Sequence, residues 1–339
     1  MTQIPRIDMT PYYAGRPGDR ARIASEIDSA CREIGFFTIV GHPIQQTALD
    51  DLFAVAREFY DLPDNEKFTY APPKGTIMRG YVPIESQNLA RSRGVEAPPD
   101  LRECFSIGRV DPMLNQPIAA HPAALFFEPN IWPRHPARFR TVNEAYYRRM
   151  ESLARDLMRL FALGLGLQED FFDPYIDDHF ATLNMNHYPP LTRPTSDGQF
   201  RAGAHSDFGS LTILAQTAGA GGLEVLNKQG QWLQIPPQPE AFVINIGDLM
   251  ARWTNDRWRS TVHRVSNPAV DRAATDRRQS ITFFFHPNYD AAIECLPTCR
   301  LADDAPRYAP TKAGEYMRQR LLSVRNLAAK PFENRIRVD

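Results

Sequence analysis

Residues 181–188 read ATLNMNHY, the first of a series of short β-type runs that continues to about residue 286. The later runs are SLTILAQT (210–217), LEVLN (223–227), QWLQI (231–235), FVINIG (242–247), STVHRV (260–265) and SITFFFH (280–286). Clusters of glycine, proline, asparagine and aspartate separate the runs, as turns between strands require. Short strands at this spacing predict a sandwich, a barrel or a jelly roll.

The rest of the chain adds helices around this β region. Residues 4–8 and 35–40 predict strands, whereas apolar periodicity predicts amphipathic helices over residues 20–34, 45–60 and 138–164. Residues 61–135 are rich in proline and lack periodicity, so we expect long loops with short strands. One more helix is expected over residues 313–326. The fold class is therefore mostly β with flanking helices.

Composition and charge narrow the class of protein. With 339 residues, of which 43% are hydrophobic, the chain can bury a large core without disulfides. Its four cysteines are expected to be reduced thiols. The formal net charge is −1 and basic residues are scattered among acids, which argues against a nucleic-acid or membrane partner. Without an apolar run of membrane length or a hydrophobic N-terminal stretch, we expect a cytoplasmic protein.

The clearest chemical pattern is the triplet His205-Ser206-Asp207, with His263 downstream in the run STVHRV. Side chains at positions i and i+2 of a strand point to one face, so His205 and Asp207 can reach one metal ion. His263 lies in another expected strand and can supply a third ligand. Two imidazoles and one carboxylate leave three coordination positions open, the arrangement of non-haem Fe(II) oxygenases.

Two further pairs could bind a carboxylate beside this metal. Arg278 and Ser280 share one face of a strand, and a guanidinium next to a hydroxyl suits a carboxylate ligand. Asn186 and Tyr188 likewise share a face and offer an amide and a phenol. Taken alone, Arg278 could equally be a surface charge among its charged neighbours.

Together these motifs resemble the isopenicillin N synthase-like family of iron(II)- and 2-oxoglutarate-dependent dioxygenases. GFFTIVGH (35–42) is similar to the family's GFF…NHG segment, although Gly41 and Pro43 replace the usual Asn and Gly. NHYPP (186–190) matches the N-x-Y-P-P strand, and Gly247-Asp248-Leu249 matches the turn before the second histidine. The resemblance extends over about residues 4 to 325, with further matches at FYDLP (59–63), RGY (79–81) and RECF (102–105).

This resemblance implies a double-stranded β-helix (jelly roll) core, a metal site and a cosubstrate site. Residues 1–135 would form an N-terminal region packed on the core, 136–300 the core with its long helix, and 301–339 a C-terminal helix and tail. The Fe(II) ligands fall on His205, Asp207 and His263. The 2-oxoglutarate contacts fall on Arg278, Ser280, Tyr188 and Asn186, and the R-x-S spacing selects Arg278 over Arg277.

The implied activity is hydroxylation or desaturation of a small molecule, with O₂ consumed and 2-oxoglutarate converted to succinate and CO₂. The partner is then a small-molecule substrate, and the protein a monomer or homodimer. Residues next to the motifs are expected to line the substrate pocket; these are Phe208, Asn245, Arg252, Trp253 and Phe285. An ion pair with Asp248 or Asp256 is the alternative for Arg252. The other histidines, His187 and His286 among them, are expected to be structural.

Three alternatives remain open at the level of sequence. An ethylene-forming enzyme would fragment 2-oxoglutarate itself, but that type carries an arginine where Asn184 stands here. Family members without 2-oxoglutarate, such as isopenicillin N synthase, also keep the R-x-S pair. A non-catalytic jelly-roll binding protein would retain the fold without turnover.

Overall fold

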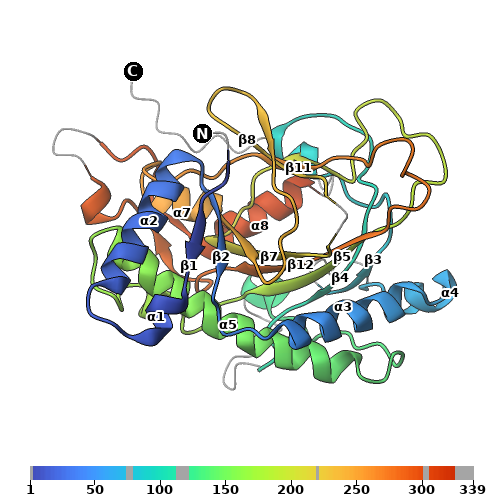
Figure 1. The fold of residues 1–339 in the computed structure, drawn as a ribbon, viewed down its shortest axis with the longest axis horizontal. Helices are drawn as coiled ribbons and strands as arrows, with labels where there is room; N and C mark the ends of the chain where they lie inside the picture. The colour runs from blue at the N-terminus through green and yellow to red at the C-terminus, as the bar shows by residue number, and fades with distance from the viewer. Residues whose placement is uncertain (1–2, 74–78, 112–121, 219–220, 301–304, 325–339) are drawn as a thin grey trace.

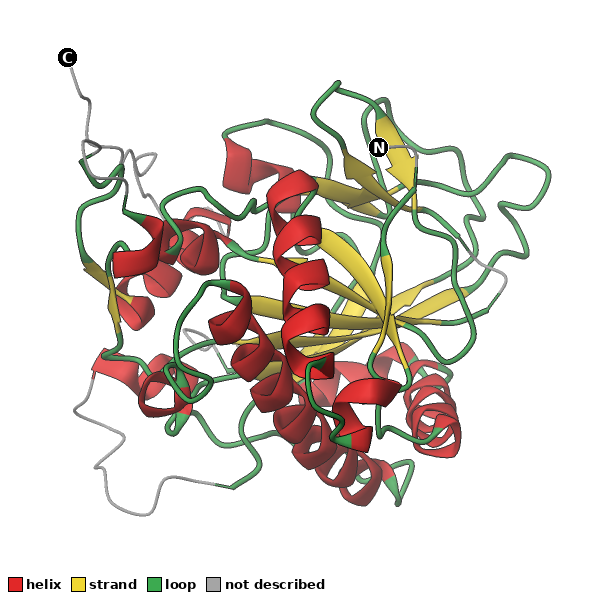
Figure 2. Cartoon of the chain, turned by 60° about the vertical axis from the view of Figure 1, so that its left-hand side comes forward, coloured by secondary structure: helices red, strands yellow, loops and turns green. Residues whose placement is uncertain are grey.

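The computed structural model describes residues 3–73, 79–111, 122–218, 221–300 and 305–324. Figure 1 shows strands from both halves of the chain gathered at the centre, with the long helices α2, α3 and α5 along the outside. The same separation is visible in Figure 2, where most helices lie on one side of the strands. None of the helices in the described part of the chain has the length and apolar character of a membrane span.

The larger sheet has eight strands in the order β1-β2-β10-β7-β12-β5-β4-β3. All neighbours pair antiparallel except β1 and β2, which are parallel. The strands are β1 (Arg6–Asp8), β2 (Phe36–Val40), β3 (Gly80–Val82), β4 (Glu103–Ile107), β5 (Thr182–Tyr188), β7 (Leu211–Gln216), β10 (Phe242–Ile246) and β12 (Arg278–Phe285). Strands from both sides of residue 135 thus share one sheet, and the division of the chain at that residue remains a prediction.

The smaller sheet has four antiparallel strands in the order β6-β11-β8-β9. They are β6 (Ala202–His205), β8 (Leu223–Leu226), β9 (Trp232–Gln234) and β11 (His263–Val265). A short pair, β13 (Ala292–Ile293) and β14 (Thr311–Lys312), lies apart from both sheets in the hydrogen-bonding pattern. Apolar side chains of both sheets, among them Phe36, Val225 and Val265, form one buried cluster. The two sheets therefore face one another, which is the jelly-roll core expected from the resemblance.

The helices follow the predicted positions closely. They are α1 (Thr10–Ala14), α2 (Asp19–Glu33), α3 (Gln46–Tyr60), α4 (Asp64–Lys67), α5 (Phe139–Gly164), α6 (Asp173–Ile176), α7 (Asp248–Trp253) and α8 (Ala313–Val324). Short 3₁₀ turns occur at Phe68–Tyr70, Leu89–Arg93, Pro122–Phe126 and Pro297–Cys299. The sequence predicts helices α2, α3, α5 and α8 to within two residues at each end, although residues 325–326 of the last prediction lie outside the described residues.

Strand alternation divides the larger sheet into two chemically different faces. On β12, Ile281, Phe283 and Phe285 belong to the main hydrophobic core together with side chains of α2, α3 and α5. Buried aliphatic and aromatic side chains of this kind contribute roughly 1.5–3 kcal/mol each. The alternate residues of the same strand, from Arg278 to Phe284, point to the space between the sheets. Polar groups can therefore gather inside the jelly roll while the opposite face supplies stability.

Candidate metal centre

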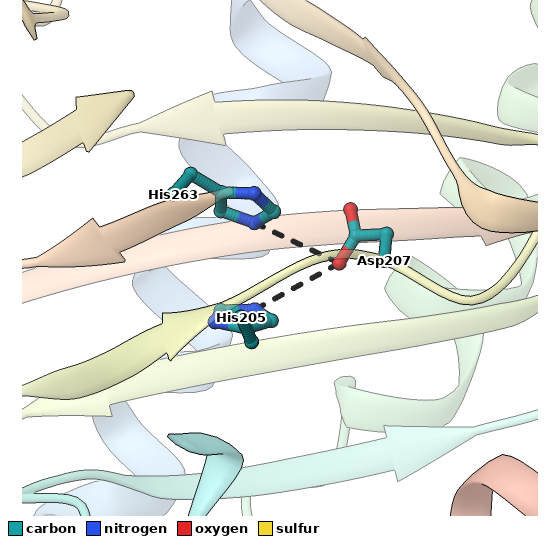
Figure 3. A group of neighbouring side chains, drawn as sticks. All are labelled: His205, Asp207 and His263. Atoms are coloured by element: carbon teal, nitrogen blue, oxygen red, sulfur yellow. Dashed lines mark ion pairs between the residues drawn. The ribbon is translucent and has the colours of Figure 1, made fainter. Parts of the chain in front are cut away.

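Three potential metal ligands converge between the two sheets. His205 is the last residue of β6 and His263 the first of β11, and the two lie directly opposite one another in the antiparallel register. Asp207 follows β6 by two residues. Figure 3 shows both imidazoles directed at the Asp207 carboxylate, with Nε2–Oδ1 distances of 3.8 Å from His205 and 3.7 Å from His263. One donor atom from each side chain lies within 4.8 Å of the others.

Backbone contacts fix both imidazoles for this role. Nδ1 of His205 lies 2.7 Å from the carbonyl oxygen of Gly203, and Nδ1 of His263 lies 3.1 Å from that of Thr261. A carbonyl only accepts, so each Nδ1 must carry the proton and each Nε2 keeps its lone pair for a metal. Burial, followed by the neighbouring His263, lowers the pKa of His205 well below its usual value. The neutral form that a metal requires is thus favoured.

The Asp207 carboxylate is held by its other oxygen. Oδ2 accepts hydrogen bonds from Thr212 Oγ1 and Asn245 Nδ2, both at 2.7 Å, which leaves Oδ1 facing the histidines. Thr212 and Asn245 are cross-strand partners on β7 and β10. Burial alone would raise the pKa of Asp207, but His263, His205 and the two hydrogen bonds hold it below its usual value. The carboxylate is therefore ionised and oriented, as a ligand should be.

Asp207 reaches the centre from a loop rather than from a strand. The sequence argument placed Asp207 on the same strand face as His205, which is wrong because β6 ends at His205. The loop instead docks on the start of α7, where the backbone N–H of Asp248 donates to the Asp207 carbonyl at 2.8 Å. The approach is close enough that a Cβ on Gly247 would lie 2.1 Å from the carbonyl oxygen of Gly209. Glycine at position 247 is therefore required for this docking.

A buried arginine lies farther along the inner face of the larger sheet. The Arg278 side chain is fully buried, its Nη2 donates to Gln216 Oε1 at 2.8 Å, and its Cζ lies 4.6 Å from the centre of the Tyr188 ring. Its Nε and Nη1 are buried and have no hydrogen-bond partner among the described residues. Since a buried, unpaired guanidinium is costly, these two groups are placed to receive an anion.

The neighbouring residues settle which arginine is available. Arg277 pairs with Asp61 at 2.6 Å and its Nε donates to His187 Nε2 at 2.8 Å, so its charge is already compensated. Asn186 Nδ2 donates to Thr282 Oγ1 at 3.1 Å and, more weakly, to Ser280 Oγ at 3.4 Å. The residues expected to contact 2-oxoglutarate thus share one face, and Arg278 is not the surface charge of the alternative interpretation.

Two cavities meet at the potential ligands His205 and Asp207, and His263 lines the smaller one. The smaller, of about 50 Å³, extends between the sheets toward Tyr188 and Asn186. The larger, of about 140 Å³, opens on the other side beneath α8. Both are lined by His205 and Asp207. A metal bound here would therefore face a narrow, partly polar space between the sheets on one side and a roomier space on the other.

The expected pocket residues divide into two groups. Phe208 lines the larger cavity, and Asn245 lines the smaller one through its contact with Asp207. Trp253 and Phe285 instead belong to the main hydrophobic core, because they point to the helix-covered side. Arg252 lies over the rings of Tyr308 and Tyr316 and donates to the Ala309 carbonyl, and it lines neither cavity. The pocket assignment of these three residues is therefore wrong.

Sequence reasoning missed several residues that line the larger cavity. Phe284 lines it in place of Phe285, as alternation along β12 could have indicated. His286, expected to be structural, also lines it and has a buried Nδ1 without a partner among the described residues. Arg102 lines both cavities. Leu89, Met317 and Leu321 reach the cavity from distant segments, and no local signal in the sequence marks them.

Comparison with known protein families agrees with this geometry. Residues 4–135 match the family described as the non-haem dioxygenase in morphine synthesis N-terminal region. Residues 179–287 match the 2OG-Fe(II) oxygenase superfamily. The second match includes all three residues of the His205, Asp207 and His263 cluster.

Individual relatives match over nearly the whole chain. The 2-oxoglutarate-Fe(II) type oxidoreductase hxnY of Emericella nidulans is 35% identical over 94% of this chain and 89% of its own. Homoarginine-6-hydroxylase 2-ODD-233 of rice, Oryza sativa, is 31% identical over 94% of this chain and 97% of its own. The crystal structure of a full-length Neurospora crassa protein in complex with alpha-KG and thymine has a TM-score of 0.82 at 30% identity, covering 94% of this chain and 96% of that one.

Proposed function

The chain belongs to the 2-oxoglutarate- and Fe(II)-dependent oxygenase family, and from that premise we propose that it hydroxylates or desaturates a small organic molecule. It is an oxidoreductase that uses Fe(II) and 2-oxoglutarate, with O₂ as the usual co-substrate of the family. The observation that carries the proposal is the convergence of two imidazole Nε2 atoms and one oriented carboxylate at the junction of two cavities.

The side chains fit a ferrous ion. His205 Nε2, His263 Nε2 and Asp207 Oδ1 are the three atoms left free by the surrounding hydrogen bonds. Two nitrogens and one oxygen in this arrangement suit Fe(II) and leave positions for other ligands. We therefore assign these three residues as the iron ligands.

The smaller cavity and the arginine behind it fit 2-oxoglutarate. Arg278 offers two buried N–H groups without partners among the described residues, which match the far carboxylate of a dicarboxylic acid. Tyr188 lies against the same guanidinium and lines the cavity, and Asn186 lines it nearer the metal ligands. Ser280 completes the set on the same face of β12. We assign these four residues as the 2-oxoglutarate contacts.

When bound, iron and 2-oxoglutarate together supply the oxidising chemistry: O₂ is reduced, 2-oxoglutarate loses CO₂ to become succinate, and a C–H bond of the substrate is oxidised. The protein holds the reacting groups in place and excludes bulk water. Thr212 and Asn245 hold the Asp207 carboxylate, while buried apolar side chains, Phe36 and Val265 among them, line the smaller cavity next to it. The substrate is placed in the larger cavity, where Phe208 and Phe284 can fix its position.

The relatives support a small-molecule substrate without identifying it. One is named a homoarginine hydroxylase, another a proline hydroxylase, and the Neurospora crassa protein was crystallised with thymine. A cavity of about 140 Å³ accommodates a small molecule or part of one rather than a macromolecule. Action on a small molecule by a monomer or homodimer, with no nucleic-acid or membrane partner, is therefore part of the proposal.

The test begins with purified protein under anaerobic conditions. Adding Fe(II) and then 2-oxoglutarate should produce a visible absorption band that neither component gives with the protein alone. Admitting O₂ should release succinate, with ethylene measured in the headspace to detect fragmentation of 2-oxoglutarate. Absence of both the band and succinate would contradict the proposal, and ethylene in place of succinate would indicate the ethylene-forming alternative.

A further inference from the structure

The two cavities beside the iron ligands contain very few charged side chains. Among the described residues that line them, only Asp207 and Arg102 carry a formal charge. Asp207 is accounted for as an iron ligand. Arg102, which precedes β4 directly, lines both cavities and has no role in the function proposed above.

Arg102 contacts neutral groups only. Its Nη1 donates to Asn186 Oδ1 at 2.8 Å and its Nη2 to Gln87 Oε1 at 2.7 Å, and both acceptors are uncharged amides. The phenol of Tyr188 is a further uncharged hydrogen-bond partner. Its Nε is buried and has no hydrogen-bond partner in the described part of the chain. Arg102 itself is half-buried, and none of the carboxylates that the structure describes forms an ion pair with it.

The two acids nearest to Arg102 in the sequence, Glu103 and Asp100, are already engaged. Glu103 pairs with Lys67 at 3.1 Å and lies 2.7 Å from His187 Nδ1. Asp100 Oδ1 accepts from the Gly203 N–H at 2.8 Å and its Oδ2 from the Leu89 N–H at 3.0 Å. These bonds hold Asp100 against the backbone of the β6 region, and it lines neither cavity. Asp100 therefore positions the segment that carries Arg102. Its negative charge favours the Arg102 cation without forming an ion pair with it, and inside the cavities no carboxylate contacts the guanidinium.

The charges inside the two cavities leave one cation without a carboxylate contact. Fe(II) contributes two positive charges, 2-oxoglutarate two negative charges, Asp207 one negative charge and Arg278 one positive charge, and these cancel. Arg102 is the cation that remains among the cavity-lining residues, since the charge of Asp100 acts on it from outside both cavities. We propose that the substrate is a small monoanion whose carboxylate is bound by Arg102 in the larger cavity. This inference rests on the proposed function and specifies its substrate class.

The other residues that line the larger cavity indicate the chemistry of the rest of the substrate. The apolar part of this lining consists of Leu89, Phe208, Phe284, Met317 and Leu321. The polar part is uncharged and consists of Ser106, Thr182, Asn184, Ser206 and His286. Burial lowers the pKa of His286 to about 3, so it is a neutral imidazole. Asn184 Oδ1 and His286 Nδ1 are buried without partners among the described residues, which suits a neutral polar group on the substrate away from its carboxylate.

The cavity volume indicates what fits beside the iron ligands. At about 140 Å³ the cavity is close to the engineered protein cavities of roughly 150 Å³ that accommodate benzene. One ring or a short chain therefore fits in the cavity, against a wall that includes Phe208 and Phe284.

The experiment compares acids with the matching uncharged amides. The anaerobic complex with Fe(II) and 2-oxoglutarate is dialysed to equilibrium against benzoate or benzamide, 4-hydroxybenzoate or 4-hydroxybenzamide, and hexanoate or hexanamide. We expect at least one acid to bind about tenfold or more tightly than its amide, the difference that one charged hydrogen-bonded contact provides. R102Q should remove this preference, R102K should retain part of it, and R20Q, which changes an exposed arginine, should leave it unchanged.

The absorption band of the Fe(II) and 2-oxoglutarate complex distinguishes a failure of the monoanion proposal from a failure of the proposed oxygenase function. R102Q should still form this band, although losing the Arg102 contacts to Asn186 and Tyr188 should raise the 2-oxoglutarate concentration that the band requires by a few-fold. No preference for any acid over its amide in the wild type, or an equal preference in R102Q, would overturn the monoanion proposal while leaving the oxygenase assignment intact. Loss of the band in R102Q would also overturn it, since Arg102 would then belong to the 2-oxoglutarate site. A missing band in the wild type would instead contradict the proposed function.

Discussion

The iron ligands and the larger cavity beside them differ in how completely their polar groups are satisfied. Around the iron ligands, each imidazole contacts a backbone carbonyl and the carboxylate has two donors on one oxygen. In the larger cavity, Arg102, Asn184 and His286 each retain a buried polar atom without a partner in the described part of the chain. The difference teaches that the iron centre is organised before anything binds, whereas the larger cavity is completed by its ligand.

The largest expected effect comes from removing an iron ligand. His205→Ala takes away one of three donors, so iron should no longer be retained and succinate formation should fall to background. Iron content after gel filtration and succinate release together measure this. A variant that kept bound iron and turnover would place the metal elsewhere.

The cosubstrate end of β12 can be tested with two adjacent arginines. Arg278→Ala removes a bidentate partner for the 2-oxoglutarate carboxylate, and the KM for 2-oxoglutarate should rise about 100-fold. Arg277→Ala is the matched control, because its charge is compensated by Asp61 on the other side of the strand. Steady-state kinetics in 2-oxoglutarate distinguish the two. Equal effects in both variants would contradict the assignment of Arg278.

Substituting either residue of the pair that holds the Asp207 carboxylate should have a smaller effect on Fe(II) binding than removing an iron ligand. Thr212→Val and Asn245→Ala each remove one hydrogen bond to Oδ2 and should weaken Fe(II) binding by roughly 10- to 100-fold. Titration of the apo-protein with Fe(II) under argon gives the affinity. Unchanged affinity in both variants would show that the orientation of Asp207 does not depend on this pair.

The smallest expected effects come from substituting two adjacent rings that lie on opposite faces of β12. Phe284→Leu alters the wall of the larger cavity and should change which substrates are accepted with little effect on stability. Phe285→Leu lies in the main core and should lower the free energy of unfolding by about 1 kcal/mol without changing substrate preference. Urea unfolding and a substrate panel measure both properties, and the reverse outcome would mean that the two rings are assigned to the wrong faces.

The sequence predicts the parts of the molecule that depend on local spacing. Helix α5 follows from apolar periodicity, and the pairing of Arg278 with Ser280 on one face follows from the two-residue repeat of a strand. The three potential ligands also lie together in space as expected, although the reason given for Asp207 was wrong. Its position depends on how the loop docks on α7, a contact between distant segments.

Substrate-facing residues could not be derived in the same way. Trp253 and Arg252 are close to the motifs in sequence, but a helix directs each side chain independently of that proximity. Arg102 and Leu321 are more than 200 positions apart and line the same cavity. Only the tertiary fold brings such residues together. Sequence motifs therefore predict the metal and cosubstrate sites, but they do not predict the shape of the larger cavity.

Helix α8 has a consequence for how this enzyme could acquire new specificities. It provides Met317 and Leu321 to the larger cavity, whereas the three metal-binding side chains come from β6, the loop after it and β11. Tyr316 and Arg320 anchor the helix to the single carboxylate of Asp248. Substitutions in α8 can therefore change which substrates the enzyme accepts while the three iron ligands stay unchanged.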